Sequence, residues 1–434
     1  MVTMKREAEK GKIKDSCWAW IHIVRWVLEF SKVDRSDFGD SWFHVFYQCI
    51  INMLKMKFDD LLVSVVVAIV IFFNTLSTTM LNKGIFHMNA STLLLVVLLL
   101  ALRFWNKIHV SYTYLLFSLA LLSIGALVYM KTGRLNFLVY SLLMSLLISA
   151  DRKVVLRTYI FVGGSILVSV FFLSLLKVIP NLQYSRGGVI RNSFGFIYPT
   201  DFASHCFYLF VAISYLLKNR YIWLRTFVGF FLAVFLIKFC DARMNAYSLL
   251  VGTLIFVFFY LTKEKKIGLY ALMPYSAAIF SSLILYLTYH FSWTSPFYVK
   301  INQLITGRLA LGKNAFNLYE LNWFGTRGVQ FIGSGGSTES VLSYNYVDSS
   351  YVQMLFTYGI VPVFALVLIY IVVSRDEYKK GRYLYVAILS LITVNCMIEA
   401  FWFVPSYNIF MFILFTRNTI DDSPSETVGE LSYS

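Results

Sequence analysis

The sequence predicts an all-α, polytopic helical membrane protein with about 12 transmembrane helices and a large extracytoplasmic loop between helices 9 and 10. The 434 residues are 58% hydrophobic and only 14% charged, with a mean hydropathy of +0.68, whereas soluble domains carry roughly 25% charged residues. The apolar blocks run close to the ~20 residues with which a helix crosses a hydrocarbon core. They also lack the alternating pattern of outer-membrane strands.

The first 57 residues differ from the rest of the chain. Basic residues between Lys5 and Lys14 precede an aromatic stretch, Trp18 to Phe30, that is too polar to cross lipid. We therefore expect residues 1–57 to form a cytoplasmic or interfacial amphipathic segment, without a secretory signal peptide. Because this segment precedes every motif described below, we expect it to be dispensable for chemistry.

The expected transmembrane domain covers residues 58–417, and a disordered cytoplasmic tail, residues 418–434, is expected to follow it. The apolar segments that we assign to membrane helices are 60–81, 90–105, 110–130, 135–150, 154–179, 200–217, 221–238, 244–262, 267–289, 351–374, 383–403 and 404–417.

Lysine and arginine residues set the expected orientation. They concentrate in short connections between the apolar segments, as the positive-inside rule requires of cytoplasmic loops. Both termini are therefore expected in the cytoplasm, and the loops at 180–199 and 290–350 on the outer face. The net charge of +15 then reports orientation in a lipid bilayer, and no nucleic-acid partner is expected.

Cysteines and histidines give no sign of a metal centre. The five cysteines lie scattered without CxxC spacing, and the six histidines lack HxxxH spacing. We expect neither a disulfide framework nor a metal site, and no cofactor.

Four arginines on the predicted outer face are not explained by the positive-inside rule. Arg186 and Arg191 lie in the loop at 180–199, Arg243 opens an apolar segment, and Arg308 lies in the large loop. Helix N-termini, with their unsatisfied N–H groups, are expected at the same face. Because guanidinium groups beside helix N-termini bind phosphate, this face predicts a site for a membrane-bound pyrophosphate. The alternatives are a solvated or headgroup-facing Arg186, and an amphipathic loop helix that places Arg308 in water.

Each residue that could act as a general base has two possible interpretations. Asp348 is either the N-cap of the helix that follows it or a base that activates a sugar hydroxyl. Asp201 and His205, one helical turn apart, could act in the same way, or they could be a capping aspartate and a hydrogen-bonded core histidine. The residues expected to bind substrate are Arg186, Tyr198, Asp201, His205, Tyr346 and Tyr351.

Three stretches resemble a known family. Residues 191–199, RNSFGFIYP, are similar to the R-x-S-x-G-F-x-x-P element of Wzy-type polysaccharide (O-antigen or capsule) repeat-unit polymerases, which belong to the O-antigen ligase superfamily. Two further matches follow in the family's order, at residues 307–325 and 346–361. The resemblance covers about residues 58–417.

The resemblance implies a GT-C-like, metal-independent membrane glycosyltransferase. Its implied reaction polymerises undecaprenyl-pyrophosphate-linked oligosaccharides on the outer face of the bacterial cytoplasmic membrane, with a flippase and a chain-length regulator as partners. In the family, outer-face arginines hold the donor pyrophosphate, and the matching positions are Arg191, Arg243 and Arg308. Related ligases place a histidine where this chain has Asp348, which favours a capsule or exopolysaccharide polymerase over a lipid A-core ligase.

A lipid-linked oligosaccharide flippase is the main alternative from another class, because it would also place basic residues at membrane depth. A flippase should show repeat-related halves, which this sequence lacks, and it does not need a large outer loop. An O-antigen-ligase-type transferase remains the alternative within the superfamily.

Overall fold

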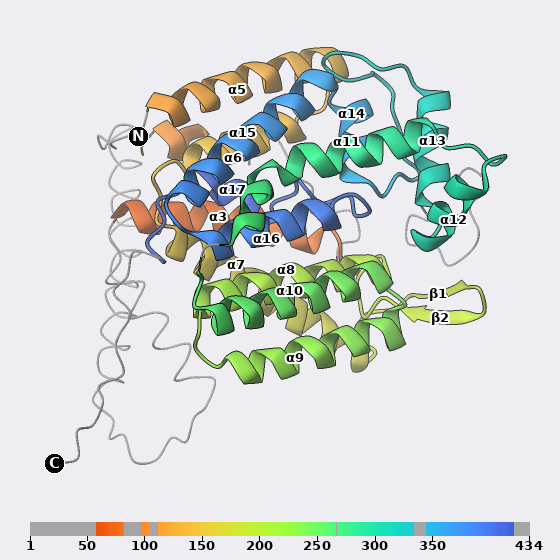
Figure 1. The fold of residues 1–434 in the computed structure, drawn as a ribbon, viewed down its shortest axis with the longest axis horizontal. Helices are drawn as coiled ribbons and strands as arrows, with labels where there is room; N and C mark the ends of the chain where they lie inside the picture. Colours follow the sequence, from red (N-terminus) through yellow and green to blue (C-terminus); the bar gives the residue numbers. More distant parts are fainter. Residues whose placement is uncertain are drawn as a thin grey trace, which may run out of the picture. The chain divides into compact units, whose positions relative to one another are not determined.

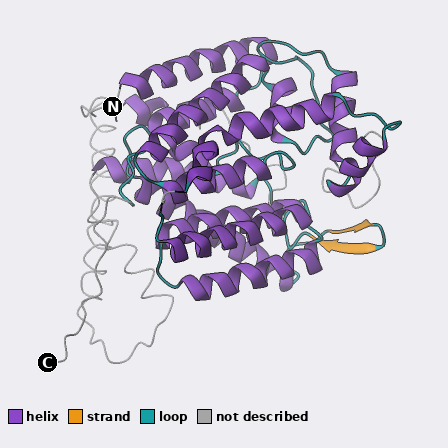
Figure 2. Cartoon of the chain, viewed as in Figure 1, coloured by secondary structure: helices purple, strands orange, loops and turns teal. Residues whose placement is uncertain are grey.

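The computed structural model describes residues 58–81, 97–101, 103, 112–265, 267–333 and 344–420. They belong to one compact unit, Phe58–Ser434, and are mostly helical (Figures 1 and 2). The expected amphipathic segment at 1–57, most of the apolar segment at 90–105 and the tail beyond residue 420 lie outside the described residues.

The α-helices follow the chain in the order α3 (Phe58–Leu76), α5 (Tyr112–Thr132), α6 (Asn136–Leu146), α7 (Arg152–Leu175), α8 (Pro199–Leu217), α9 (Ile222–Phe235), α10 (Arg243–Thr262), α11 (Ser276–Tyr289), α12 (Pro296–Leu304), α13 (Arg308–Leu318), α14 (Ser350–Thr357), α15 (Ile360–Lys379), α16 (Tyr383–Asn395) and α17 (Ile409–Phe412). A π-helix, η1 (Leu236–Cys240), extends α9, and two 3-10 helices, η2 (Gly268–Tyr275) and η3 (Ile413–Phe415), complete the set.

Seven helices of the described chain are long and apolar enough to cross a membrane. This confirms the polytopic helical membrane protein, although the expected number of about 12 spans is not confirmed. The seven candidate spans are Asp59–Leu76, Tyr112–Thr132, Arg152–Leu175, Pro199–Leu217, Ile222–Cys240, Arg243–Thr262 and Tyr270–Tyr289.

Several expected segments differ from the single long helices that we predicted; segment 383–403, for example, forms only the 13-residue α16. Segment 135–150 forms only the 11-residue α6, and segment 404–417 forms only the short α17 and η3. Segment 351–374 is broken into α14 and α15 at Gly359, which has a φ of 103°. A Cβ at Gly359 would lie 2.3 Å from the backbone nitrogen of Gly325. The break therefore depends on a close backbone contact that hydropathy does not reveal.

Close helix contacts organise the bundle. α7 packs against α3 and α8, and α10 packs against α8, α9 and α16, so that α8, α9 and α10 lie side by side (Figure 1). At Gly229 of α9, a Cβ would lie 2.3 Å from the hydroxyl of Thr253 on α10. Such small residues allow close approach between helices in lipid, where apolar burial alone does not drive their association.

A β-hairpin corrects the all-α expectation. β1 (Gln183–Arg186) and β2 (Val189–Asn192) pair antiparallel between α7 and α8. Gly187 and Gly188 connect them with φ values of 57° and 80°, the backbone that a two-residue type I′ turn requires. The strands are only four residues long, so the pattern of long apolar runs does not indicate them. The hairpin lies at the same end of the bundle as α12 and α13 (Figure 1).

Candidate anion-binding site

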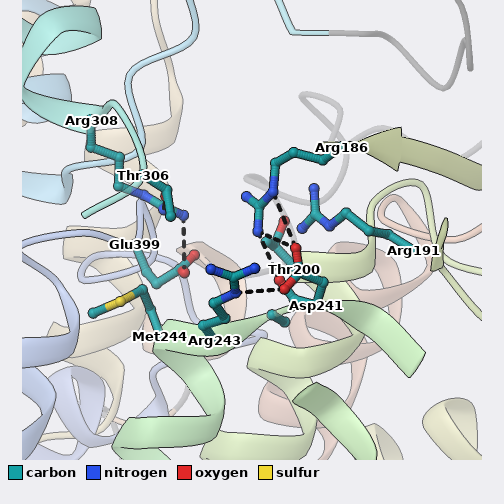
Figure 3. Close-up of a pocket in the computed structure, with 10 residues that line it drawn as sticks. Arg186, Arg191, Thr200, Asp241, Arg243, Met244, Thr306, Arg308 and Glu399 are labelled. Carbon is teal, nitrogen blue, oxygen red and sulfur yellow. Dashed lines mark hydrogen bonds and ion pairs between the residues drawn. The ribbon is translucent and has the colours of Figure 1, made fainter. Parts of the chain in front are cut away.

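Arg186, Arg191, Arg243 and Arg308, the four arginines singled out on the predicted outer face, all line one pocket (Figure 3). The pocket is partly open, and its volume of about 220 Å³ includes space that is open to solvent. Arg186 and Arg191 come from β1 and β2, whereas Arg243 and Arg308 begin α10 and α13. The residues around the pocket are Arg186, Arg191, Thr200, Asp241, Ala242, Arg243, Met244, Thr306, Arg308 and Glu399.

Three helices begin at this pocket. Thr200 lies in the first turn of α8, Arg243 in the first turn of α10, and Arg308 in the first turn of α13. The first turn of a helix presents unpaired N–H groups and the positive end of the helix dipole. The pocket therefore combines guanidinium charge with helix-terminal charge of the same sign, and this combination suits an anion.

Asp241 pairs with two of the arginines. Its Oδ2 accepts a hydrogen bond from Nη2 of Arg186 at 2.6 Å, and its Oδ1 accepts one from Nε of Arg243 at 2.7 Å. The Asp241 side chain is only 5% exposed. One buried carboxylate thus orients two guanidinium groups whose side chains remain accessible.

Arg191 differs from its neighbours because it has no ion-pair partner within the described part of the chain. Its Nε donates to the backbone oxygen of Cys240 at 3.1 Å, and its guanidinium points into the pocket (Figure 3). Burial, and to a smaller extent the nearby Arg186, lower the pKa of Arg191 to about 10. The side chain is still a cation at neutral pH, and its charge is not compensated by a directly bonded carboxylate.

Arg308 lies between two carboxylates. Its Nε is 3.3 Å from Oδ2 of Asp348, and its Nη2 is 3.4 Å from Oε1 of Glu399. The side chain is only 8% exposed, so the alternative that α13 places Arg308 in water is wrong. The N-cap interpretation of Asp348 is also wrong, because the N-cap of α14 is Ser349. The Asp348 side chain turns towards Arg308 instead.

Burial raises the pKa values of both carboxyl groups beside Arg308, those of Asp348 and Glu399. Burial raises the pKa of Asp348 above its ordinary value, although Arg308 and Arg191 oppose this effect. Burial raises the pKa of Glu399 to about 8, again against the effect of Arg308, and the nearby Asp348 raises it further. Two like charges on one buried guanidinium disfavour each other. Burial therefore favours the protonated form of Glu399 near neutral pH.

Glu399 and Asp241 were not among the predicted site residues. Glu399 lies in the turn after α16, inside a segment that we predicted to be membrane helix, and it is only 3% exposed. An isolated acidic residue within an apolar stretch was the available signal, because such residues rarely face lipid. For Asp241, the signal was its place between two apolar runs and next to Arg243.

Asp201 and His205 do not line the pocket. Asp201 accepts hydrogen bonds from the backbone nitrogen of Tyr198 at 3.2 Å and from the hydroxyl of Tyr407 at 3.0 Å. His205 stacks on the Tyr407 ring at 4.1 Å and lies 3.3 Å from the hydroxyl of Thr78. Both residues thus have the partners that a capping aspartate and a core histidine require. A role for either in substrate binding stays a prediction.

The predicted substrate-binding tyrosines separate into two groups. Tyr351 is fully buried, and its hydroxyl donates to the backbone oxygen of Thr393 at 3.1 Å, so it belongs to the core. Tyr198 and Tyr346 are partly exposed and flank Gly333. The ring of Tyr184 lies 5.9 Å from that of Tyr198. These partly exposed rings are the aromatic surfaces that a sugar could contact.

Comparison with known proteins gives no further assignment. The chain matches no protein-family model, no curated protein and no solved structure. The resemblance to Wzy-type polymerases therefore depends on the three sequence stretches alone.

Proposed function

We propose that the chain is a metal-independent membrane glycosyltransferase that polymerises undecaprenyl-pyrophosphate-linked oligosaccharide repeat units. The observation that carries this proposal is the convergence of four arginines and three helix N-termini on one pocket of an apolar helical bundle. Such a pocket suits an anion whose hydrophobic tail lies in the bilayer. A lipid pyrophosphate has both properties.

The charge of the pocket favours a diphosphate over a single phosphate. Four guanidinium groups face three carboxyl groups, and burial favours the protonated form of one of these, Glu399, near neutral pH. Arg191, which has no directly bonded carboxylate among the described residues, adds a cation whose N–H donors other than Nε remain available. Because a guanidinium can bind two phosphate oxygens at once, arginines from separate segments can contact both phosphate groups.

In the proposed reaction, an acceptor sugar hydroxyl attacks the anomeric carbon of the donor. The new glycosidic bond forms as the bond between that carbon and the diphosphate oxygen breaks. Asp348 accepts the hydroxyl proton, which then passes to solvent. The arginines of the pocket stabilise the negative charge that develops on the departing lipid diphosphate. The raised pKa of Asp348 supports its role, because it makes this carboxylate a stronger base than an ordinary aspartate.

We place the pocket on the outer face of the bacterial cytoplasmic membrane, with both termini in the cytoplasm. The support is that α8 and α10 begin at the pocket and lead to the basic residues Lys218 and Lys263 at their other ends. A cysteine at Ser185 in β1 should then react with an impermeant thiol reagent added to intact cells, and one at Lys265 should not. Both positions are exposed, whereas the native cysteines of the described segments are buried.

The test of the reaction uses purified chain and lipid-linked oligosaccharides extracted from its native host. The expected product is a ladder whose bands differ by one repeat unit. Movement of the oligosaccharide across a liposome membrane without a ladder would contradict the proposal and favour a flippase. Transfer of a glycan to lipid A-core alone would instead favour the ligase-type alternative.

A further inference from the structure

One short turn receives hydrogen bonds from three of the four pocket arginines. It consists of Cys240, the last residue of η1, and Asp241, which leads from η1 towards α10. Arg186 donates to the side chain and backbone oxygen of Asp241, Arg191 donates to the backbone oxygen of Cys240, and Arg243 donates to the Asp241 side chain. Asp241 adopts the left-handed conformation, with φ 45° and ψ 38°. A left-handed non-glycine residue directly after a π-helix is a combination that concentrates at functional sites.

The Asp241 carboxylate occupies N–H donors that an anion in the pocket would use. Arg186 presents Nη2 and Nε to Oδ2 at 2.6 and 3.2 Å, and Arg243 presents Nε to Oδ1 at 2.7 Å. Burial alone would raise the pKa of Asp241, but the hydrogen bonds and charges of both arginines outweigh this effect and hold the pKa below its ordinary value. The two arginines therefore stabilise Asp241 as an anion at the edge of the anion site.

We infer that Asp241 is a built-in competitor that shares Arg186 and Arg243 with the donor diphosphate and limits how tightly the pocket holds it. This inference rests on the proposed function. Glycosyl transfer converts a diphosphate diester into a diphosphate monoester, which has one more ionisable oxygen. A pocket in which all four arginines were unpaired would bind this product more tightly than the donor. With Asp241 present, some of the guanidinium donors return to an internal partner when the lipid diphosphate leaves, which favours turnover.

The test is calorimetric titration of inorganic pyrophosphate, without metal ions, into the purified full-length chain. Asp241→Asn removes the charge but keeps a hydrogen-bond acceptor, and asparagine tolerates the left-handed conformation. We expect Asp241→Asn to bind pyrophosphate about tenfold more tightly than the native chain, because hydrogen bonds to charged groups are among the stronger ones. An unchanged or weaker affinity would overturn the inference and leave Asp241 as a structural residue.

Two further variants complete this experiment. If Asp241→Asn is not recovered in folded form, Asp241→Gly provides the same test, since glycine adopts the left-handed conformation freely. Asp376→Asn is the matched control, because Asp376 is an exposed partner of Lys380 that does not line the pocket, and its affinity should stay within about twofold of the native value. If neither the native chain nor Asp241→Asn binds pyrophosphate, the anion site itself fails. Binding that Asp241→Asn does not tighten contradicts only the role of Asp241.

Discussion

Two arginine clusters lie a helix length apart in this protein, and they differ in how completely their donors are used. Arg152 begins α7, whereas Arg186 and Arg191 follow the end of that helix. Arg152 is 0% exposed; its Nη2 is 3.2 Å from Glu377, its Nε is 3.1 Å from the hydroxyl of Thr416, and its guanidinium lies 4.1 Å from the ring centre of Tyr385.

The comparison shows that burial of an arginine in a membrane helix does not by itself indicate a ligand site. The Arg152 cluster has no room for a ligand, because Glu377 and Thr416 bind the edges of the guanidinium and the Tyr385 ring covers its face. In the pocket, by contrast, Arg191 has one backbone partner, and Asp241 is shared between two arginines. N–H donors that remain available in an open pocket, rather than burial, therefore distinguish the arginine pocket from the Arg152 cluster.

The largest loss of activity should follow Asp348→Asn. The substitution keeps the size of the side chain but removes the base, so single-turnover transfer should fall about 10²–10⁴-fold while donor binding survives. Glu320→Gln, at an exposed position in the same large loop, is the control. Near-normal transfer by Asp348→Asn would show that positioning and leaving-group stabilisation are sufficient.

Arg191→Ala should have the next largest effect, because it removes the pocket arginine that has no carboxylate partner among the described residues. We expect turnover to fall about 10²–10³-fold, the loss typical of removing one group that stabilises developing negative charge. Lysine should restore only part of the rate, since it keeps the charge but loses the bidentate geometry. The exposed Arg327 gives the matched control, Arg327→Ala. If Arg191→Ala and Arg327→Ala have the same turnover, the role of Arg191 in binding the donor is contradicted.

Arg152→Ala should separate stability from chemistry. It removes a partner of the buried Glu377, and the loss of one partner of a buried ion pair destabilises by about 3–5 kcal/mol. Arg382 still pairs with Glu377 at 3.1 Å, so we expect the lower end of that range. Thermal denaturation in detergent measures the change. Activity per folded molecule should remain near normal, and a large loss at unchanged stability would remove the distinction between the two clusters.

Glu399→Gln should have the smallest effect, visible as an altered pH dependence of donor binding. Since the pKa of Glu399 is about 8, the native pocket gains a negative charge as pH rises from 7 to 9. Donor affinity should therefore decrease by up to about tenfold over this range. The diphosphate diester itself loses no proton there, and Arg191 titrates higher, at about 10. The glutamine variant should bind the donor equally across the range, and a parallel decrease in both proteins would exclude Glu399 as the titrating group.

Local sequence patterns predicted the helices and the four arginines, because span length and the distribution of positive charge are properties of short segments. The partners of those arginines could not be predicted in the same way. Glu399 lies 91 residues from Arg308, and Asp241 lies 55 residues from Arg186, so only the folded chain brings them together. Hydropathy also does not separate membrane spans from a buried core, since residues 404–417 are mostly apolar but lie in the core as turns and short helices.

The central claim, that the arginine pocket binds the diphosphate of a lipid-linked donor, can be tested by comparing two lipids. Binding of undecaprenyl diphosphate and undecaprenyl monophosphate to the purified chain is measured for the native protein, Arg191→Ala and Arg327→Ala. We predict that the native chain and Arg327→Ala bind the diphosphate lipid at least about tenfold more tightly, because only the diphosphate reaches the arginines on both sides of the pocket. We also predict that Arg191→Ala loses this preference. Equal affinity of the native chain for the two lipids, or a preference that survives in Arg191→Ala, would contradict the claim.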